Sequence, residues 1–444
     1  MEIIFTCSLG ILLLALFIGK DWSHPVVLML GIWVFVLLLY NLRAFQIVPP
    51  TTEIVGVLAA MLGGFLAGYV VCYLFRMARN KRLVMSLGGD SAHRVEGKAG
   101  DGHLREALFF VLCAVAALVM LVDQFHIIQS VLSGASFADV MRAAEGKGTV
   151  EISGTVQVAL YMFIVHPMTA CVSPICAVEV STRRDGRLKY FAINLIIVFL
   201  AVFHHGGRNA IIVMCLSYLL AYALLRKDGA YIPRKVKTAF ILGGAIACVA
   251  VFALSSSRGI QDIWLSFYAY FITGIPLGQQ YLAASHFIVG HTFGFFSLQG
   301  ITYPLYSVLA FIGVQPPELY DMASTMSDYI EANYLSIGDY SATGMNTFMP
   351  AGAYPYVDGG YVFEFVFMAL YGCVSCCLYQ QRGQSGERSK AIYVLWAYGL
   401  LLSFCRLYFA SYSYVVGLLL MAFVLYGRKP KKRIAKNDES RRYE

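Results

Sequence analysis

Long apolar runs recur along almost the whole chain, separated by short charged breaks, and they limit what it can fold into. Of its 444 residues, 59% are hydrophobic and only 14% are charged, whereas about a quarter of a soluble protein's residues are charged. A run of about 20 apolar residues forms a helix that crosses the roughly 30 Å hydrocarbon core of a bilayer. The sequence therefore predicts an all-α polytopic integral membrane protein and excludes a cytosolic enzyme, a secreted disulfide scaffold and a disordered chain.

The runs predict eleven transmembrane helices. They lie at residues 2–19, 24–41, 53–75, 104–123, 154–180, 190–204, 209–226, 238–256, 359–380, 391–408 and 412–427. Residues 1–255 thus hold eight helices with a smaller outer loop at 124–153, and residues 359–427 hold three more. Residues 256–358 form one large extracytoplasmic loop, and residues 428–444 form a basic tail.

The positions of lysine and arginine predict which way the chain faces. When the breaks are assigned alternately, 28 of the 34 basic residues fall on one side, and this side is the cytoplasm by the positive-inside rule. The N-terminus is then periplasmic and the C-terminus cytoplasmic. The net charge of +8 belongs to the face that meets anionic membrane lipids, so no nucleic-acid partner is predicted.

The large outer loop has an ordered composition, with twenty aromatic residues between Trp264 and Tyr356. Its apolar runs at 263–277 and 295–313 are expected to re-enter the membrane or lie at its surface, because the connection at 284–294 has no lysine or arginine to hold it in the cytoplasm. Pro316-Pro317 before Glu318 predicts the start of an amphipathic surface helix.

Four arginines on the outer side run against the charge bias. Arg208 lies in the hairpin tip His204-His205-Gly206-Gly207-Arg208-Asn209, Arg258 follows three serines, Arg406 is at the end of a span, and Arg142 is in the smaller loop. One interpretation is that they reach lipid headgroups. Ionisable residues inside a membrane usually face a functional cavity, however, and the planar guanidinium suits phosphate. We therefore expect a phosphate-bearing ligand at the outer face.

The loop also suits sugars. Residues 256–360 carry seven carboxylates against one basic residue, and eleven tyrosines lie between Tyr268 and Tyr356. Tyrosine rings and carboxylates can stack on sugar rings and accept hydrogen bonds from their hydroxyls. The turn-rich segment from Asn346 to Gly360, just before a span, is the predicted centre of the binding site.

Three segments resemble the O-antigen polymerases (Wzy), which join oligosaccharide repeat units. These are Gly206-Gly207-Arg208-Asn209-Ala210, the stretch from Tyr268 to Gly294, and Asn346 to Gly360, where the family has an Asn-x-Tyr-Thr element and an Asp-Phe-Gly element. This chain departs from that pattern in Asn346-Thr347-Phe348 and in Asp358-Gly359-Gly360.

The resemblance implies a glycosyltransferase of the bacterial inner membrane that polymerises undecaprenyl-diphosphate-linked oligosaccharides. A chain-length regulator and a flippase would be its partners. Arg208 and Arg258 are predicted to stabilise the diphosphate leaving group, with Asp358 as the first choice of general base and His291 or His205 as the second. Substrate binding is assigned to Arg142, Arg406, His205, His291, Asn346, Tyr354 and Tyr356.

Neither a metal nor a cofactor is predicted, since no HExxH-type ligand spacing occurs in the chain. Two alternatives remain open from the sequence. An O-antigen ligase would use the same donor with a different acceptor, and a lipid-linked oligosaccharide flippase or other transporter would move the substrate without reaction. Transporters often carry repeated halves with matching broken helices, and such halves are not evident in this sequence.

Overall fold

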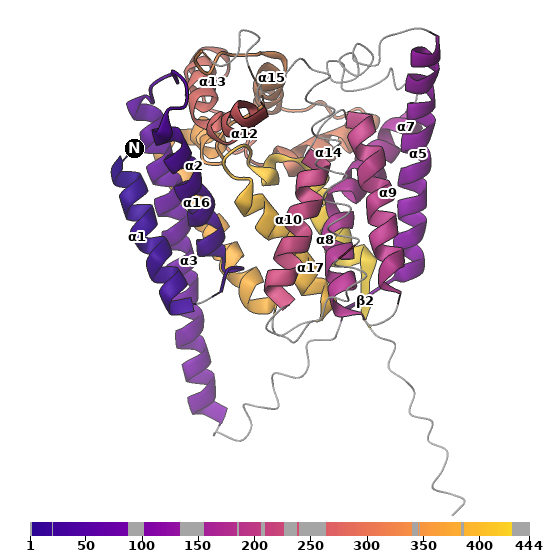
Figure 1. Ribbon diagram of the computed structural model, residues 1–444, viewed down its shortest axis with the longest axis horizontal. Coiled ribbons are helices and arrows are strands. Elements are labelled where there is room, and N and C mark those ends of the chain that lie inside the picture. Colours follow the sequence, from indigo (N-terminus) through magenta and orange to yellow (C-terminus); the bar gives the residue numbers. More distant parts are fainter. Residues whose placement is uncertain are drawn as a thin grey trace, which may run out of the picture.

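The protein is a bundle of helices in which segments far apart in sequence lie side by side (Figure 1). The computed structural model describes residues 2–19, 21–87, 102–133, 155–183, 186–205, 209–225, 238, 263–339, 345, 347–382 and 386–428. Four described helices are long and apolar enough to cross a membrane, with apolar stretches at Pro25–Leu42, Thr52–Arg79, Val158–Thr182 and Ala353–Gln381. The chain is therefore an all-α membrane protein, as its apolar runs predict.

The first half of the described chain contains the following elements. They are α1 (Glu2–Gly19), α2 (Pro25–Leu42), α3 (Thr52–Leu87), strand β1 (Gly102–Leu104), α5 (Glu106–Leu132), α7 (Thr155–Leu160), the π-helix η2 (Tyr161–Val165), α8 (His166–Thr182), α9 (Arg187–His205) and α10 (Asn209–Leu225). The π turn η2 ends two residues before Pro167, which has no N–H to donate to the helical hydrogen-bond ladder.

The second half forms the outer helices and the last spans. Its elements are α12 (Ile263–Ile272), α13 (Gly274–Ile288), α14 (Gln299–Phe311), α15 (Glu318–Ala332), α16 (Ala353–Gln381), α17 (Glu387–Leu401), the 3-10 turn η4 (Tyr408–Ala410), α18 (Tyr412–Leu419), the π-helix η5 (Leu420–Leu425) and strand β2 (Tyr426–Arg428). Helices occupy ten of the eleven predicted runs, and in the remaining run, 238–256, only Thr238 is among the described residues.

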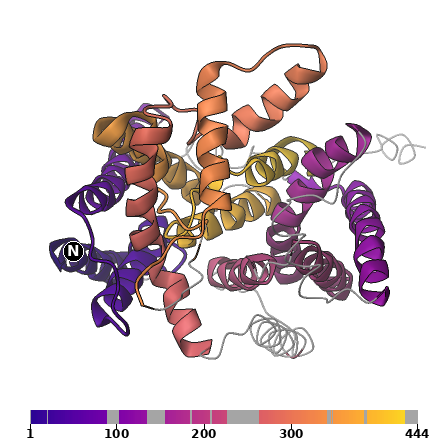
Figure 2. The same cartoon turned by 90° about the horizontal axis from the view of Figure 1, so that it is seen from above.

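The described residues 263–339 of the large loop contain four short helices at one end of the bundle. Helices α12, α13 and α14 have 10, 15 and 13 residues, fewer than the roughly 20 that a perpendicular span needs. Together with α15 they lie at the top of Figure 1, and Figure 2 shows them from above. The predicted short helices are thus present, and α15 begins at Glu318 directly after Pro317, as predicted.

Helices α3 and α16 pack so closely that glycine is required at their contact. A Cβ on Gly64 would lie 2.6 Å from the Phe365 carbonyl oxygen, and one on Gly68 would lie 1.8 Å from that of Ala369. Gly372 makes the same approach to Phe65 from the opposite helix. Small residues four apart let two membrane helices bring their backbones together, and this contact positions α16 below the outer helices.

Helix α16 begins six residues before its predicted start and breaks where the sequence predicts the span to begin. Gly359 and Gly360 have non-helical backbone angles, and Gly360 has a φ of 71°, which glycine adopts without steric cost. The turn Ala353–Asp358 is thereby separated from the long apolar part of the helix. This turn carries three of the predicted site residues.

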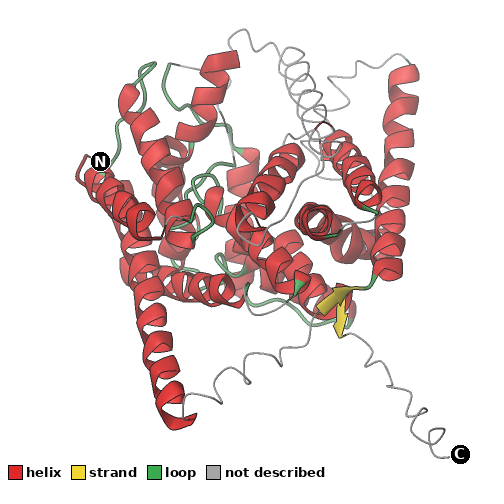
Figure 3. Cartoon of the chain, turned by 60° about the horizontal axis from the view of Figure 1, so that its bottom comes forward, coloured by secondary structure: helices red, strands yellow, loops and turns green. Residues whose placement is uncertain are grey.

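The opposite end of the bundle carries a small sheet that the sequence did not predict. Strands β1 and β2 pair antiparallel, with His103 opposite Gly427, and they are visible where the lower end of the molecule comes forward in Figure 3. Basic residues gather at this end, at Arg183, Arg382, Arg388 and Arg428 beside helix ends or in β2. Among the described residues, Arg43 and Arg406 lie at the other end.

Candidate functional site

The segment that follows the outer helices is bound along its backbone to the loop after α17. The N–H of Met349 donates to the Cys405 carbonyl at 2.9 Å, and that of Ala351 donates to the Ser403 carbonyl at 2.8 Å. Backbone pairing of this kind fixes one segment against the other without depending on side-chain identity. The first turn of α16 and the residues around Arg406 are consequently held together.

Arg406 lies between a buried tyrosine and an exposed carboxylate. Its Nη2 atom is 3.3 Å from Glu331 Oε1 at the end of α15, and its guanidinium lies near the Tyr354 hydroxyl. Burial alone lowers the pKa of Arg406, but Tyr354 and Glu331 outweigh it and raise that pKa above its usual range. The side chains of Arg406 and Glu331 are 37% and 62% exposed, so the fixed positive charge is open to a ligand.

A second contact joins the same loop to the start of α10. The Tyr408 hydroxyl donates to Asn209 Oδ1 at 3.0 Å. Asn209 directly follows Arg208 in the sequence and belongs to the Gly-Gly-Arg-Asn motif. Asn209, the described residue of this motif, therefore lies against the same loop that carries Arg406.

Asp358 stabilises the residues that pack against Tyr354. Its carboxylate is fully buried and accepts hydrogen bonds from the Thr292 hydroxyl at 2.5 Å and from the N–H groups of Phe296 and Ser297 at 3.1 and 2.9 Å. The Phe296 ring in turn stacks on Tyr354, with centroids 4.8 Å apart. With both oxygens bonded and no exposed surface, Asp358 is suited to positioning the Tyr354 support, not to acting as the base predicted from the sequence.

Aromatic rings pair between α14, α15 and the start of α18. Tyr303 stacks on Tyr412 with centroids 5.1 Å apart, and Tyr306 lies 5.0 Å from Tyr320. Burial and the nearby Asp328 carboxylate raise the pKa of the Tyr303 hydroxyl, which stays protonated. Rings beside acceptors offer both stacking faces and hydrogen-bond partners to a sugar chain.

Tyr356 belongs to a different cluster. Its hydroxyl donates to Glu53 Oε1 at 2.8 Å, and His286 Nε2 lies 2.9 Å from the same oxygen. Residues two apart in a helix point about 200° apart, so Tyr354 and Tyr356 face opposite sides of the first turn of α16. His291 is exposed and donates from Nδ1 to the Val357 carbonyl at 3.3 Å. The predicted site residues thus divide between two faces.

The remaining predicted residues are not placed. Arg142, Arg208, Arg258 and Asn346 lie outside the described residues, and His205 ends α9 with its side chain also outside them. Conversely, Glu331, Tyr408, Glu53 and His286 were not assigned to the site from the sequence. The surplus of carboxylates in the outer loop is the one signal that pointed toward Glu331. Among the described residues, no three His, Cys, Asp or Glu side chains form a group that could hold a metal ion.

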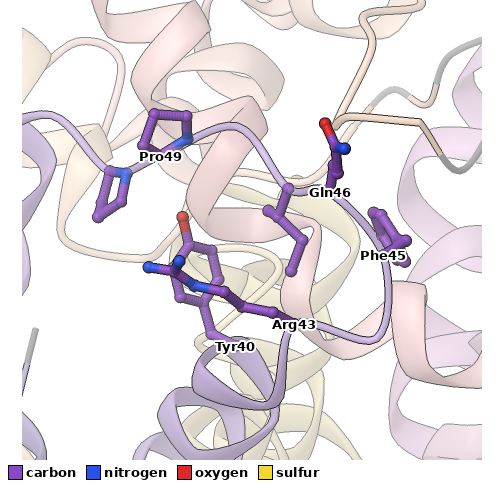
Figure 4. A pocket seen from close by; sticks show the side chains of 7 residues that line it. Tyr40, Arg43, Phe45, Gln46 and Pro49 are labelled. Carbon is purple, nitrogen blue, oxygen red and sulfur yellow. The ribbon is translucent and has the colours of Figure 1, made fainter.

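The loop between α2 and α3 forms a separate open pocket at the same end. It has a volume of about 480 Å³ and is lined by Tyr40, Arg43, Phe45, Gln46, Ile47, Pro49 and Pro50. In Figure 4 the Arg43 side chain extends from the loop toward Tyr40. The loop is bound to the outer helices, since the Gln279 amide accepts from Thr51 N–H and donates to the Pro49 carbonyl. None of the residues around Arg406 lines this pocket.

The fold and the site define an all-α membrane protein with a helical outer cap and an arginine held beside it. The chain matches no family model, no curated protein and no solved structure. The function is therefore argued from the site itself.

Proposed function

We propose that the protein is a membrane glycosyltransferase that polymerises undecaprenyl-diphosphate-linked oligosaccharide repeat units at the periplasmic face of the bacterial inner membrane. One observation carries the proposal: Arg406 pairs with Glu331 at the outer end of the bundle with 37% of its side chain exposed, and an aromatic wall of tyrosines lies on α14, α15 and α18. A fixed cation suits the diphosphate of the donor, and the wall suits its sugars.

The leaving group determines what the site must supply. When the bond between the donor sugar and its diphosphate breaks, negative charge develops on the diphosphate oxygens. A preorganised guanidinium stabilises that charge without reorganising during the reaction, and it binds two oxygens at once. Arg406 provides this contact, and Arg208 and Arg258 are proposed to add to it.

The growing chain needs a surface that tolerates successive sugars. Tyrosine rings bind the apolar faces of sugars with little loss of conformational freedom, because each ring has only two rotatable bonds. The aromatic wall consists of residues on two outer helices and the last span, namely Tyr303, Tyr306, Tyr320 and Tyr412. We assign sugar binding to this aromatic wall.

Polymerisation by the purified protein tests the proposal. The protein in detergent is given synthetic undecaprenyl-diphosphate repeat units, and products are separated on a gel. We expect a ladder for the wild type, and a rate at least about 100-fold lower for Arg406→Ala, the usual effect of removing one transition-state donor. Arg406→Lys should recover only part of the rate because lysine lacks the planar fork.

Arg43→Ala is the matched control, since it removes an arginine from the same end of the bundle but from a separate pocket. It should leave the ladder unchanged. A wild-type protein that makes no ladder from the host's own repeat unit, but carries that unit across the membrane of a proteoliposome, would be a transporter and would contradict the proposal.

A further inference from the structure

Three buried oxygen atoms without a hydrogen-bond partner lie at the end of the bundle that carries the two strands. They are Oε1 of Glu179 in the last turn of α8, Oε2 of Glu387 at the start of α17, and the hydroxyl of Tyr426 at the start of β2. Glu179 is fully buried and Tyr426 is 3% exposed. Helix α17 packs against both α8 and β1, at the bottom of Figure 1. Since a buried polar atom without a partner lowers stability, this grouping indicates a site for a polar ligand.

The three side chains lie near one another although they are far apart in sequence. The charges of Glu179 and Glu387 interact with each other, and both interact with the Tyr426 hydroxyl. The Tyr426 hydroxyl nevertheless makes no hydrogen bond to either carboxylate. Oxygens that share a bound cation are arranged in this way, because each directs a lone pair at the ion and not at a neighbouring oxygen.

The carboxylates at this end outnumber the permanent cations that are bonded to them. Arg183 donates to both Glu179 and Glu106, and Lys189 Nζ lies 2.6 Å from Glu106. The third carboxylate, Glu387, has an imidazole as its ion-pair partner within the described part of the chain, 3.7 Å away, and an imidazole is mostly neutral at pH 7. Three carboxylates thus share two permanent positive charges, and one negative charge is left to be balanced.

We propose that Glu179, Glu387 and Tyr426 bind an alkali-metal cation. Carboxylate and hydroxyl oxygens are the hard ligands that such a cation takes, and its single charge matches the single unbalanced one. A transition metal requires more ligands of its own kind, whereas the described chain brings no three His, Cys, Asp or Glu side chains together as a metal group. The site is at the opposite end of the bundle from Arg406 and goes beyond the proposed reaction.

The site has a route to solvent and a structural consequence. Glu387 and the neighbouring His103 are 22% and 37% exposed, so an ion enters past them toward the buried Glu179. The bound cation joins α8, α17 and β2. Tyr426 also directly follows the π-helix η5, and π turns are frequent at functional sites. Cation binding therefore stabilises the position of the two strands against the helices.

Cation binding to the purified full-length protein tests the site. Radiolabelled sodium and rubidium, the second in place of potassium, are titrated at about pH 8, where the imidazole is neutral. Choline chloride keeps the ionic strength constant, because choline is too large for a buried site. We expect saturable binding, and the ion that binds at the lower concentration is the preferred ligand. Its chloride should raise the unfolding midpoint by about 2–5 °C over choline chloride.

Two variants connect the binding to the named oxygens. Glu387→Gln alters a partly exposed residue and should abolish saturable binding, because the unbalanced charge is gone. Tyr426→Phe removes one ligand and keeps the ring, so the half-saturating concentration should rise about tenfold. Glu318→Gln is the control, since it neutralises a carboxylate at the other end of the bundle; it should bind the ion as the wild type does.

Two results would overturn the assignment. If the wild type binds neither ion saturably, the buried carboxylates are balanced by a proton and not by a cation. If it binds an ion with equal affinity in Glu387→Gln and Tyr426→Phe, the ion lies elsewhere in the molecule. Neither result bears on the polymerisation assay, so the proposed function is judged separately.

Discussion

At the residue scale, Glu364 is a buried carboxyl group in the described structure that has no hydrogen-bond partner. Its side chain is fully buried in α16 and neither carboxyl oxygen has a hydrogen-bond partner. Oε1 faces Gly352, where a Cβ would approach it to 2.4 Å, and Met61 of α3 lies alongside. A buried polar group without a partner lowers stability, and ionisable residues in membrane helices usually serve function.

Replacing Glu364 with methionine should therefore raise stability. The two side chains have similar size, and methionine removes the uncompensated polar atoms, so we expect a gain of about 1–3 kcal/mol in the free energy of unfolding. Thermal unfolding in detergent measures it, with the exposed Glu318→Gln as the control for charge loss alone. A fall in the unfolding midpoint would show that the carboxyl has a stabilising partner.

Asp21, in contrast to Glu364, is a buried carboxylate with several hydrogen-bond partners. It lies between α1 and α2 and accepts hydrogen bonds from Ser23, from the Tyr379 hydroxyl and from Arg382, the last two at 2.7 Å. Burial acts to raise its pKa, but these hydrogen bonds and the Arg382 charge hold the pKa of Asp21 well below its usual range. This carboxylate connects the first helix pair to the end of α16.

Because the pKa of Asp21 is lowered in the folded protein, the direction in which pH changes the free energy of unfolding can be predicted. The stability that Asp21 contributes is present above its unfolded pKa of about 3.9 and is lost as the pH falls through the lower pKa of the folded state. Asp21→Asn should cost about 2 kcal/mol at pH 7, since it weakens the bonds to Tyr379 and Arg382. Unfolding measured from pH 7 to pH 2 should show the two proteins converging below about pH 4. A constant difference over that range would argue against the paired carboxylate.

At the element scale, the contact between α3 and α16 determines where the site residues lie. Helix α3 presents Gly64 and Gly68 to the backbone of α16, and α16 presents Gly372 in return. Because α16 carries Tyr354 and Asp358 in its first turn, any change in this contact moves the outer site as well. The break at Gly359 and Gly360 lets that turn leave the axis of the long helix.

Two neighbouring glycines provide a matched test of the contact. A Cβ on Gly64 would lie 2.6 Å from a backbone oxygen, whereas one on Gly63 would meet nothing closer than 3.9 Å. Gly64→Ala should lower the free energy of unfolding by about 1–3 kcal/mol because the helices must separate. Gly63→Ala should change it by less than about 0.5 kcal/mol. Equal effects on thermal unfolding would rule out the close packing at Gly64.

At the scale of the whole molecule, basic residues and short outer helices occupy opposite ends. Arg183, Arg382 and Arg428 lie at the end with the two strands, and α12 to α15 lie at the other. The positive-inside rule predicts that the end with the strands faces the cytoplasm. The Arg406 site would then open to the periplasm, where the proposed reaction requires it.

Labelling of single cysteines tests that orientation. In a background with Cys7→Ser, which removes an exposed native thiol, Glu318→Cys should react with a membrane-impermeant maleimide in intact spheroplasts. Arg428→Cys should react only after the membrane is opened. The reverse pattern would place the site in the cytoplasm and exclude the proposed reaction.

The sequence by itself determined which runs of the chain become helices. In lipid every backbone N–H and C=O must be satisfied within the chain, so apolar runs such as 24–41 and 209–226 become helices whatever their neighbours. Local chemistry also placed the start of α15, because Pro317 fits only before or at the first turn of a helix. The sequence likewise singled out Arg406, Tyr354 and Asp358, because arginine and turn-rich segments are unusual beside a span, and their assignment to a site stays a prediction.

Only the tertiary structure decided which of these residues meet. Arg406 and Glu331 are 75 positions apart, and no local pattern encodes a contact that depends on how α15, α16 and α17 pack. The same packing paired β1 with β2, buried Asp358 behind Tyr354, and turned Tyr356 toward Glu53. Side-chain pairs across a bundle depend on helix rotation and close approach, and these were set by the glycine contacts of α3 and α16.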